Sequence, residues 1–163
     1  MLDNHARARA AIGESLARYC RAVDRLDMEL GLSLWTPGAQ MRYGPGIFEG
    51  SPREFFDRTF EIHRDLSFTV HRLANVVTEV RGTTAVSETS GQIVLVGLLG
   101  EDGLSEIVTA YGRYLDTWAL LDEQWLITSR DYRRDARYSQ SLEFSTFSGP
   151  RDATDFSYGV LGP

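Results

Sequence analysis

Apolar side chains recur every three to four residues between positions 8 and 26, a pattern that predicts an amphipathic first helix. One stripe of this helix is formed by Ile12, Leu16, Tyr19, Cys20 and Val23. On a helical wheel Asp24 lies about 40° from Cys20, at about 100° per residue, and therefore within the apolar stripe. Because a carboxylate is rarely buried without a partner, Asp24 is a candidate for a paired or functional acid.

Two shorter helices are predicted next from their capping residues. Asp27 is placed to cap a helix over 28–35, and a short strand over 39–43 follows it. Ser51 with Glu54 three residues later has the pattern of a capping box, which predicts the start of a third helix. The N-terminal half is therefore expected to be mainly helical.

After residue 65 the pattern changes to long alternating runs, which predict strands near 67–80, 84–99, 105–121 and 124–135. Helices followed by a strand meander indicate an α+β fold, with helices covering one face of a curved antiparallel sheet. Residues 1–137 are expected to form one domain. Residues 138–163 form a C-terminal tail, interpreted either as a lid over a cavity or as an oligomer arm.

Charge and composition narrow the class of partner. The formal net charge of −6 and the pI near 5.1 argue against nucleic acid or an anionic membrane as the main partner. Neither a membrane-spanning apolar run nor a secretory leader is recognisable, so a cytoplasmic location is expected.

The absence of certain residue types excludes several kinds of chemistry. All 17 basic residues are arginine, so a lysine Schiff base is excluded, and a single cysteine excludes an internal disulfide or a cysteine-ligated cluster. The three histidines are scattered without metal-ligand spacing, so we expect no metal centre. The sequence therefore favours acid–base chemistry without a cofactor, or plain binding.

Only one histidine, His71, lies in a predicted strand, within the alternating segment 68–77. Histidine is the most frequent general base in proteins, and Asp24 is a candidate orienter on a different element. The alternative for this pair is structural, since an arginine would satisfy Asp24 equally well. His63 is expected to be exposed on the third helix, and His5 lies near the beginning of the chain.

Five further residues are candidates for a substrate-binding pocket. Tyr19 lies on the apolar helix stripe and is either a core residue or a hydrogen-bond donor, and Tyr43 ends the short strand. Asn75 has the strand parity of the candidate histidine, and Tyr114 is a pocket or core aromatic. Arg130 faces either the cavity or the surface.

Several short motifs resemble the SnoaL-like branch of the nuclear transport factor 2-like superfamily. They occupy residues 19–27, 70–75, 112–118 and 125–130. The resemblance implies a cone-shaped sheet wrapped around a deep apolar pocket that is closed by the N-terminal helices. It also implies a homodimer or homotrimer.

The same resemblance implies roles for the candidate residues. Asp24 and His71 resemble the catalytic pair of scytalone dehydratases, bile-acid dehydratases and hexachlorocyclohexane dehydrochlorinase, and Arg130 resembles a pocket arginine. The expectation is a cofactor-independent lyase acting on a bulky apolar ring substrate. The alternatives are an isomerase or cyclase using the same base, and a non-catalytic small subunit of a ring-hydroxylating dioxygenase.

The chain also departs from these relatives. Scytalone dehydratases have a second active-site histidine on a later strand, where this chain has Gly91 and Gln92. The dehydrochlorinase has a lysine near the position of Tyr19, which this chain cannot supply. The identity of the substrate therefore does not follow from the resemblance.

Overall fold

A computed structural model describes residues 4–143 and 149–161. It confirms the α+β class. Three helices precede the long strands, namely α1 (Asn4–Arg25), α2 (Met28–Ser33) and α3 (Pro52–Arg64), with short strands β1 (Trp35–Arg42) and β2 (Glu49–Gly50) between α2 and α3. The long strands are β3 (Leu66–Arg81), β4 (Thr84–Gly97), β5 (Ser105–Leu121) and β6 (Gln124–Leu142), and a short helix α4 (Phe156–Leu161) follows.

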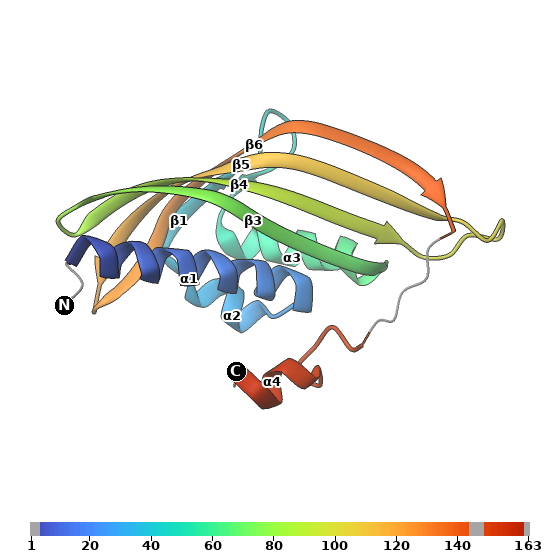
Figure 1. Ribbon diagram of the computed structural model, residues 1–163, viewed down its shortest axis with the longest axis horizontal. Helices are drawn as coiled ribbons and strands as arrows, with labels where there is room; N and C mark the ends of the chain where they lie inside the picture. The colour runs from blue at the N-terminus through green and yellow to red at the C-terminus, as the bar shows by residue number, and fades with distance from the viewer. Residues whose placement is uncertain (1–3, 144–148, 162–163) are drawn as a thin grey trace.

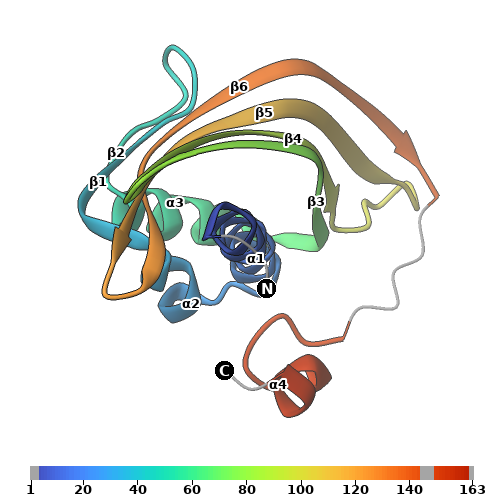
Figure 2. The same cartoon turned by 60° about the vertical axis from the view of Figure 1, so that its left-hand side comes forward.

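The six strands form one sheet in the order β2-β1-β6-β5-β4-β3. All neighbours are antiparallel except β1 and β6, which are parallel. The sheet arches over α1, α2 and α3, and the view along α1 shows the long strands curving around this helix (Figures 1 and 2). The concave face and the helices thus enclose the apolar stripe predicted from the sequence.

Both predicted helix caps are confirmed. The Asp27 side chain accepts a hydrogen bond from the backbone of Leu30, and Ser51 and Glu54 form the reciprocal capping box at the start of α3. The predicted second helix was too long, because Trp35 already belongs to β1 and pairs with Ile127 of β6. Strand pairing therefore ends α2 at Ser33.

Irregularities in strand register give the sheet its curvature. One occurs at Asn75, between Ala74 and Val76 of β3, where the backbone has a positive φ of 52°. Another occurs in β6, where Arg134 pairs with Gly112 and Ala136 pairs with Tyr111. Each bulge adds a residue to one strand, which bends the sheet and reverses the alternation of side chains beyond it.

The segment expected to be a tail is partly strand. Residues 138–142 continue β6 by pairing with the beginning of β5. The described residues after 148 contact the end of α1 and the start of α2, where Ser157 accepts from Arg21 and Tyr158 donates to Asp27. The roles of lid and oligomer arm stay predictions, as does the homodimer or homotrimer. Among the described residues, no helix is long and apolar enough to cross a membrane.

Candidate active site

A cavity of about 270 Å³ lies between the concave face of the sheet and the helices α1 and α3. Its volume is near the lower end of the usual range for small-molecule sites, about 300–1,000 Å³. The lining is mainly apolar and aromatic, with histidines and arginines but no carboxylate: Tyr19, Val23, Tyr43, Ile47, Phe55, Thr59, His63, His71, Ile93, Leu95, Val108, Ala110, Tyr114, Tyr132, Arg134 and Arg137.

His71 and Asp24 meet at the wall of this cavity. Nδ1 of His71 lies 2.7 Å from Oδ1 of Asp24, and the backbone N–H of His71 donates to Oδ2 at 2.9 Å. Both side chains are largely buried, with exposed fractions of 8% and 13%. Because a carboxylate can only accept, Nδ1 carries the proton in the neutral ring and Nε2 is left with a free lone pair.

Arg151, in the C-terminal tail, supports this pair through Thr69. Thr69 donates its hydroxyl to Oδ1 of Asp24 at 3.1 Å, and Nη2 of Arg151 donates to that hydroxyl oxygen at 2.9 Å. Arg151 also donates to the backbone oxygens of Asp24, His63 and Leu66. One arginine thus ties together α1, the end of α3 and the start of β3.

Replacing Arg151 with glutamine is expected to loosen this support. The loss of several part-buried hydrogen bonds lowers the free energy of unfolding by about 1–3 kcal/mol, measured by urea denaturation. The low-field Nδ1 proton resonance of His71 is expected to broaden as Asp24 becomes mobile. Asp152→Asn is the matched control, because among the described residues the Asp152 carboxylate accepts hydrogen bonds from Thr154 alone. An unchanged resonance in the Arg151 variant contradicts the prediction.

The candidate tyrosines converge on the same cavity. The hydroxyls of Tyr19 and Tyr43 lie 2.9 Å apart, and Tyr114 packs edge-on against Tyr19 with ring centroids 5.8 Å apart. Burial raises the pKa of Tyr19 and raises the pKa values of Tyr43 and Tyr114 well above the usual range. All three hydroxyls therefore stay protonated at neutral pH, and they act as hydrogen-bond donors rather than as bases.

Arg130 is fully buried, but it does not line the cavity. It forms a bidentate ion pair with Asp116, with N–O distances of 2.7 and 2.8 Å, and neither side chain has exposed surface. Its guanidinium lies over the rings of Tyr19 and Tyr114, at 4.1 and 4.3 Å from their centroids. Burial disfavours the charged form, but Asp116 outweighs it and raises the pKa of Arg130, which stays charged beneath the tyrosines.

Asn75 lies apart from the other candidates. In an unbroken strand Asn75 would lie on the same face as His71. The bulge at Asn75 instead leaves this residue unpaired in the sheet and exposed. Cys20 is also no nucleophile, since burial and the nearby Asp24 raise the pKa of its thiol to about 12.

Sequence reasoning was wrong about His63. This residue is only 7% exposed and lines the cavity, with its ring centroid 6.3 Å from that of His71. Burial, aided by His71 and Arg151, lowers the pKa of His63 from 6.5 to about 4, so the ring is neutral at neutral pH. Its Nδ1 is buried without a hydrogen-bond partner among the described residues. The signal that could have found it is helical spacing, since His63 follows Phe60 by three residues and Phe56 by seven, both of them buried, whereas Ile62 is 55% exposed.

The depressed pKa of His63 predicts a specific pH dependence of stability. Between pH 6.5 and about 4 the unfolded chain binds a proton here that the folded chain does not. Stability is therefore expected to fall with pH through this window, by about 3 kcal/mol at its lower end. His63→Gln removes this slope from urea denaturation curves, whereas the exposed His5→Gln leaves it unchanged. Equal slopes in both variants contradict the assignment to His63.

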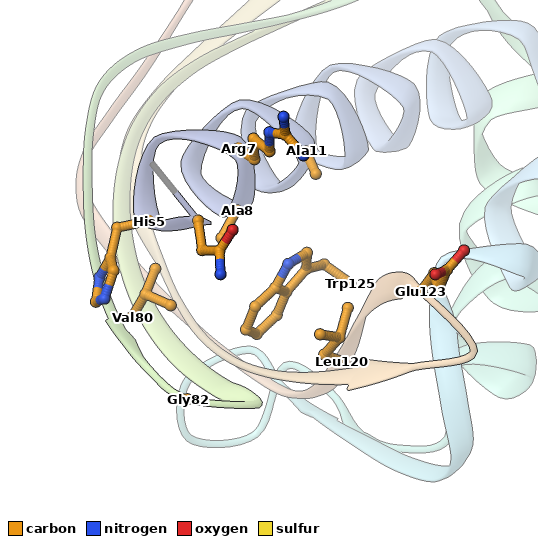
Figure 3. A pocket seen from close by; sticks show the side chains of 10 residues that line it. His5, Arg7, Ala8, Ala11, Val80, Gly82, Leu120, Glu123 and Trp125 are labelled. Atoms are coloured by element: carbon orange, nitrogen blue, oxygen red, sulfur yellow. The ribbon is translucent and has the colours of Figure 1, made fainter. Parts of the chain in front are cut away.

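A second cavity, of about 550 Å³, lies at the opposite end of α1 (Figure 3). Ala8 of α1, Leu120 and Trp125 border it, together with the exposed side chains of His5 and Glu123. His5 is about 28 Å from Asp24 along the helix, at about 1.5 Å per residue. Among the described residues that border it there is no buried acid–base pair, so the smaller cavity is the better candidate for chemistry.

The fold and the cavity together define the class of protein, a helix-covered curved sheet of the nuclear transport factor 2-like kind. The profile of the SnoaL-like domain matches residues 4–131. The chain therefore belongs to the SnoaL-like family, which confirms the resemblance drawn from the sequence. No curated protein sequence matches the chain significantly.

Several solved structures share this fold. A candidate scytalone dehydratase from Novosphingobium aromaticivorans superposes with a TM-score of 0.73 at 19% identity, over 92% of this chain and 96% of that one. A hexachlorocyclohexane dehydrochlorinase from Novosphingobium barchaimii has a TM-score of 0.65 at 21% identity, over 90% and 97%. A nuclear transport factor 2-like protein from Salmonella enterica has a TM-score of 0.66 at 22% identity, over 81% and 94%. At these identities the matches establish a shared fold.

Proposed function

We propose that the protein is a cofactor-independent lyase that removes water or a similar leaving group from an apolar ring compound. The observation that carries the proposal is the 2.7 Å contact between Nδ1 of His71 and Asp24 at the wall of an apolar cavity. Asp24 and His71 thus have the geometry of an orienter and a general base. A purely structural subunit has no need for an acid and a histidine that converge on a cavity.

In the proposed reaction Nε2 of His71 removes the proton next to a ring carbonyl. The electrons of the C–H bond pass to the carbonyl as an enolate, and their return forms the C=C bond as the leaving group departs with its bonding electrons. Asp24 stabilises the imidazolium that forms, and the imidazolium returns the proton to a leaving hydroxyl. One base serves both transfers when the proton and the leaving group lie on the same face of the ring.

The tyrosines supply stabilisation for the enolate. Tyr43 and Tyr114 line the cavity as protonated donors, so either hydroxyl can donate to the carbonyl oxygen as negative charge develops there. The charged Arg130 beneath Tyr19 strengthens this effect by polarising the linked hydroxyls of Tyr19 and Tyr43. The mainly apolar lining of the cavity increases each of these contributions.

The cavity volume favours substrates of one or two rings over a steroid. The proposal is tested with a panel of one- and two-ring ketones that carry a β-hydroxyl or β-halide, followed by mass spectrometry in D₂O. Loss of the leaving group supports a lyase. Deuterium incorporation into a substrate that keeps its leaving group indicates an isomerase or cyclase that uses the same base. If neither is found with any member of the panel, the catalytic proposal fails.

A further inference from the structure

Two arginines of β6, Arg134 and Arg137, line the same cavity as His71. Their spacing of three residues would place them on opposite faces of a regular strand. The bulge at Asp135 removes this alternation, because Arg134 pairs with Gly112 and Ala136 with Tyr111, so no residue of β5 stands opposite Asp135. Both guanidinium side chains are exposed, and they form the solvent-facing end of the cavity.

Neither arginine has a counter-charge among the described residues. The carboxylates nearby belong to other arginines: Arg133 lies 3.5 Å from Asp131, and Arg113 lies 3.0 Å from Asp135. Within the described part of the chain, Arg134 and Arg137 form no ion pair, and no Asp or Glu lines the cavity. In a chain with a net charge of −6, this end of the cavity is a local excess of positive charge.

The strand opposite places small residues across from the two arginines. Gly112 stands across from Arg134, and Ala110 stands across from Arg137. The ring of Tyr132 fills the space above Gly112, where an added Cβ would lie 2.6 Å from it. A ligand therefore has room beside Ala110 and Arg137, where the alanine projects little beyond the backbone, rather than directly over Gly112. Val108 and Leu95 continue the wall with apolar surface. The cavity thus offers an apolar interior and a cationic outer end.

We propose that the substrate is a one- or two-ring compound with a carboxylate, which Arg134 and Arg137 bind at the outer end of the cavity. This inference rests on the proposed function, since it places the ring of that substrate beside His71. Guanidinium groups bind carboxylates through paired, charge-assisted hydrogen bonds, which fix orientation as well as position. The carboxylate anchors the ring so that one face is presented to Nε2 of His71.

The test measures binding with calorimetry and needs no turnover. The probes are benzoate and 1-naphthoate, each compared with its carboxamide, which has nearly the same shape without the charge. The unmodified protein is expected to bind at least one carboxylate at least tenfold more tightly than its carboxamide. Arg134→Gln and Arg137→Gln are each expected to weaken carboxylate binding by about tenfold and to leave carboxamide binding unchanged.

Arg133→Gln is the matched control, because it removes the same charge from the adjacent position, where the arginine pairs with Asp131. It is expected to change neither affinity. Equal binding of carboxylate and carboxamide, an equal loss in the Arg133 variant, or no saturable binding of either carboxylate up to millimolar concentrations overturns the proposal. Carboxylate binding that follows the prediction, together with turnover that survives loss of His71, overturns the catalytic proposal alone.

Discussion

Replacing His71 with alanine is expected to lower turnover by about a thousandfold or more while the fold is retained. Among the described residues that line the cavity, His71 is the one whose imidazole contacts a largely buried carboxylate. General base catalysis typically contributes a factor of about 10²–10⁴, and loss of the pair also removes the site that returns the proton. The measurement is the rate of elimination or of deuterium exchange on the best substrate from the panel.

Asp24→Asn sharpens this prediction because it preserves the shape of the side chain. An asparagine amide that donates to Nδ1 places the ring proton on Nε2, where the base must be free. Turnover is therefore expected to fall to nearly the level of the His71 variant. His5→Ala serves as the control, since His5 lies at the far end of α1. Circular dichroism checks folding in each variant, and substantial turnover in a folded His71→Ala protein refutes the base assignment.

Asp116→Asn is expected to lower the free energy of unfolding by about 3–5 kcal/mol. The substitution leaves the guanidinium of Arg130 charged and unpaired at a site with no exposed surface. The surrounding rings of Tyr19, Tyr114 and Trp35 attract the cation but replace only part of the lost interaction. Urea denaturation measures the change.

Asp135→Asn is the matched control for this prediction. Asp135 also forms a two-pronged pair, with Arg113, but these side chains are 47% and 40% exposed. Water screens and solvates an exposed pair, so the loss is expected to stay below about 1 kcal/mol. The double variant Asp116→Leu with Arg130→Met is expected to recover much of the stability, because it removes both buried charges. Equal destabilisation by Asp116→Asn and Asp135→Asn contradicts the argument.

Much of the fold was predictable because its signals are local. Hydrophobic periodicity located α1, and the capping residues Asp27 and Ser51 located the starts of α2 and α3. Alternation predicted the strands β3 to β6, with beginnings that agree to within a residue. The end of β6 was missed because strand pairing with the start of β5, rather than alternation, extends it to Leu142.

The candidate pair was predictable for a similar reason. A carboxylate on an apolar helix stripe and a histidine in a strand are each unfavourable to bury without a hydrogen-bond or ion-pair partner. That requirement singled out Asp24 and His71, and the structure places them in hydrogen-bond contact. Which partner each would find was open, because an arginine would have satisfied Asp24 equally well.

The sequence by itself determined the class of fold, the starts of the helices and the candidate pair Asp24 and His71. The tertiary structure decided which other side chains face the cavity. Bulges at Asn75 and Asp135 reverse the alternation, so Asn75 leaves the cavity while Arg134 and Arg137 share it. The packing of α3 buries His63. Bulges depend on the pairing of strands that are distant in the chain, and local pattern does not record where they fall. Helical spacing places His63 on the apolar side of α3, but the sheet and α1 decide that this side is buried.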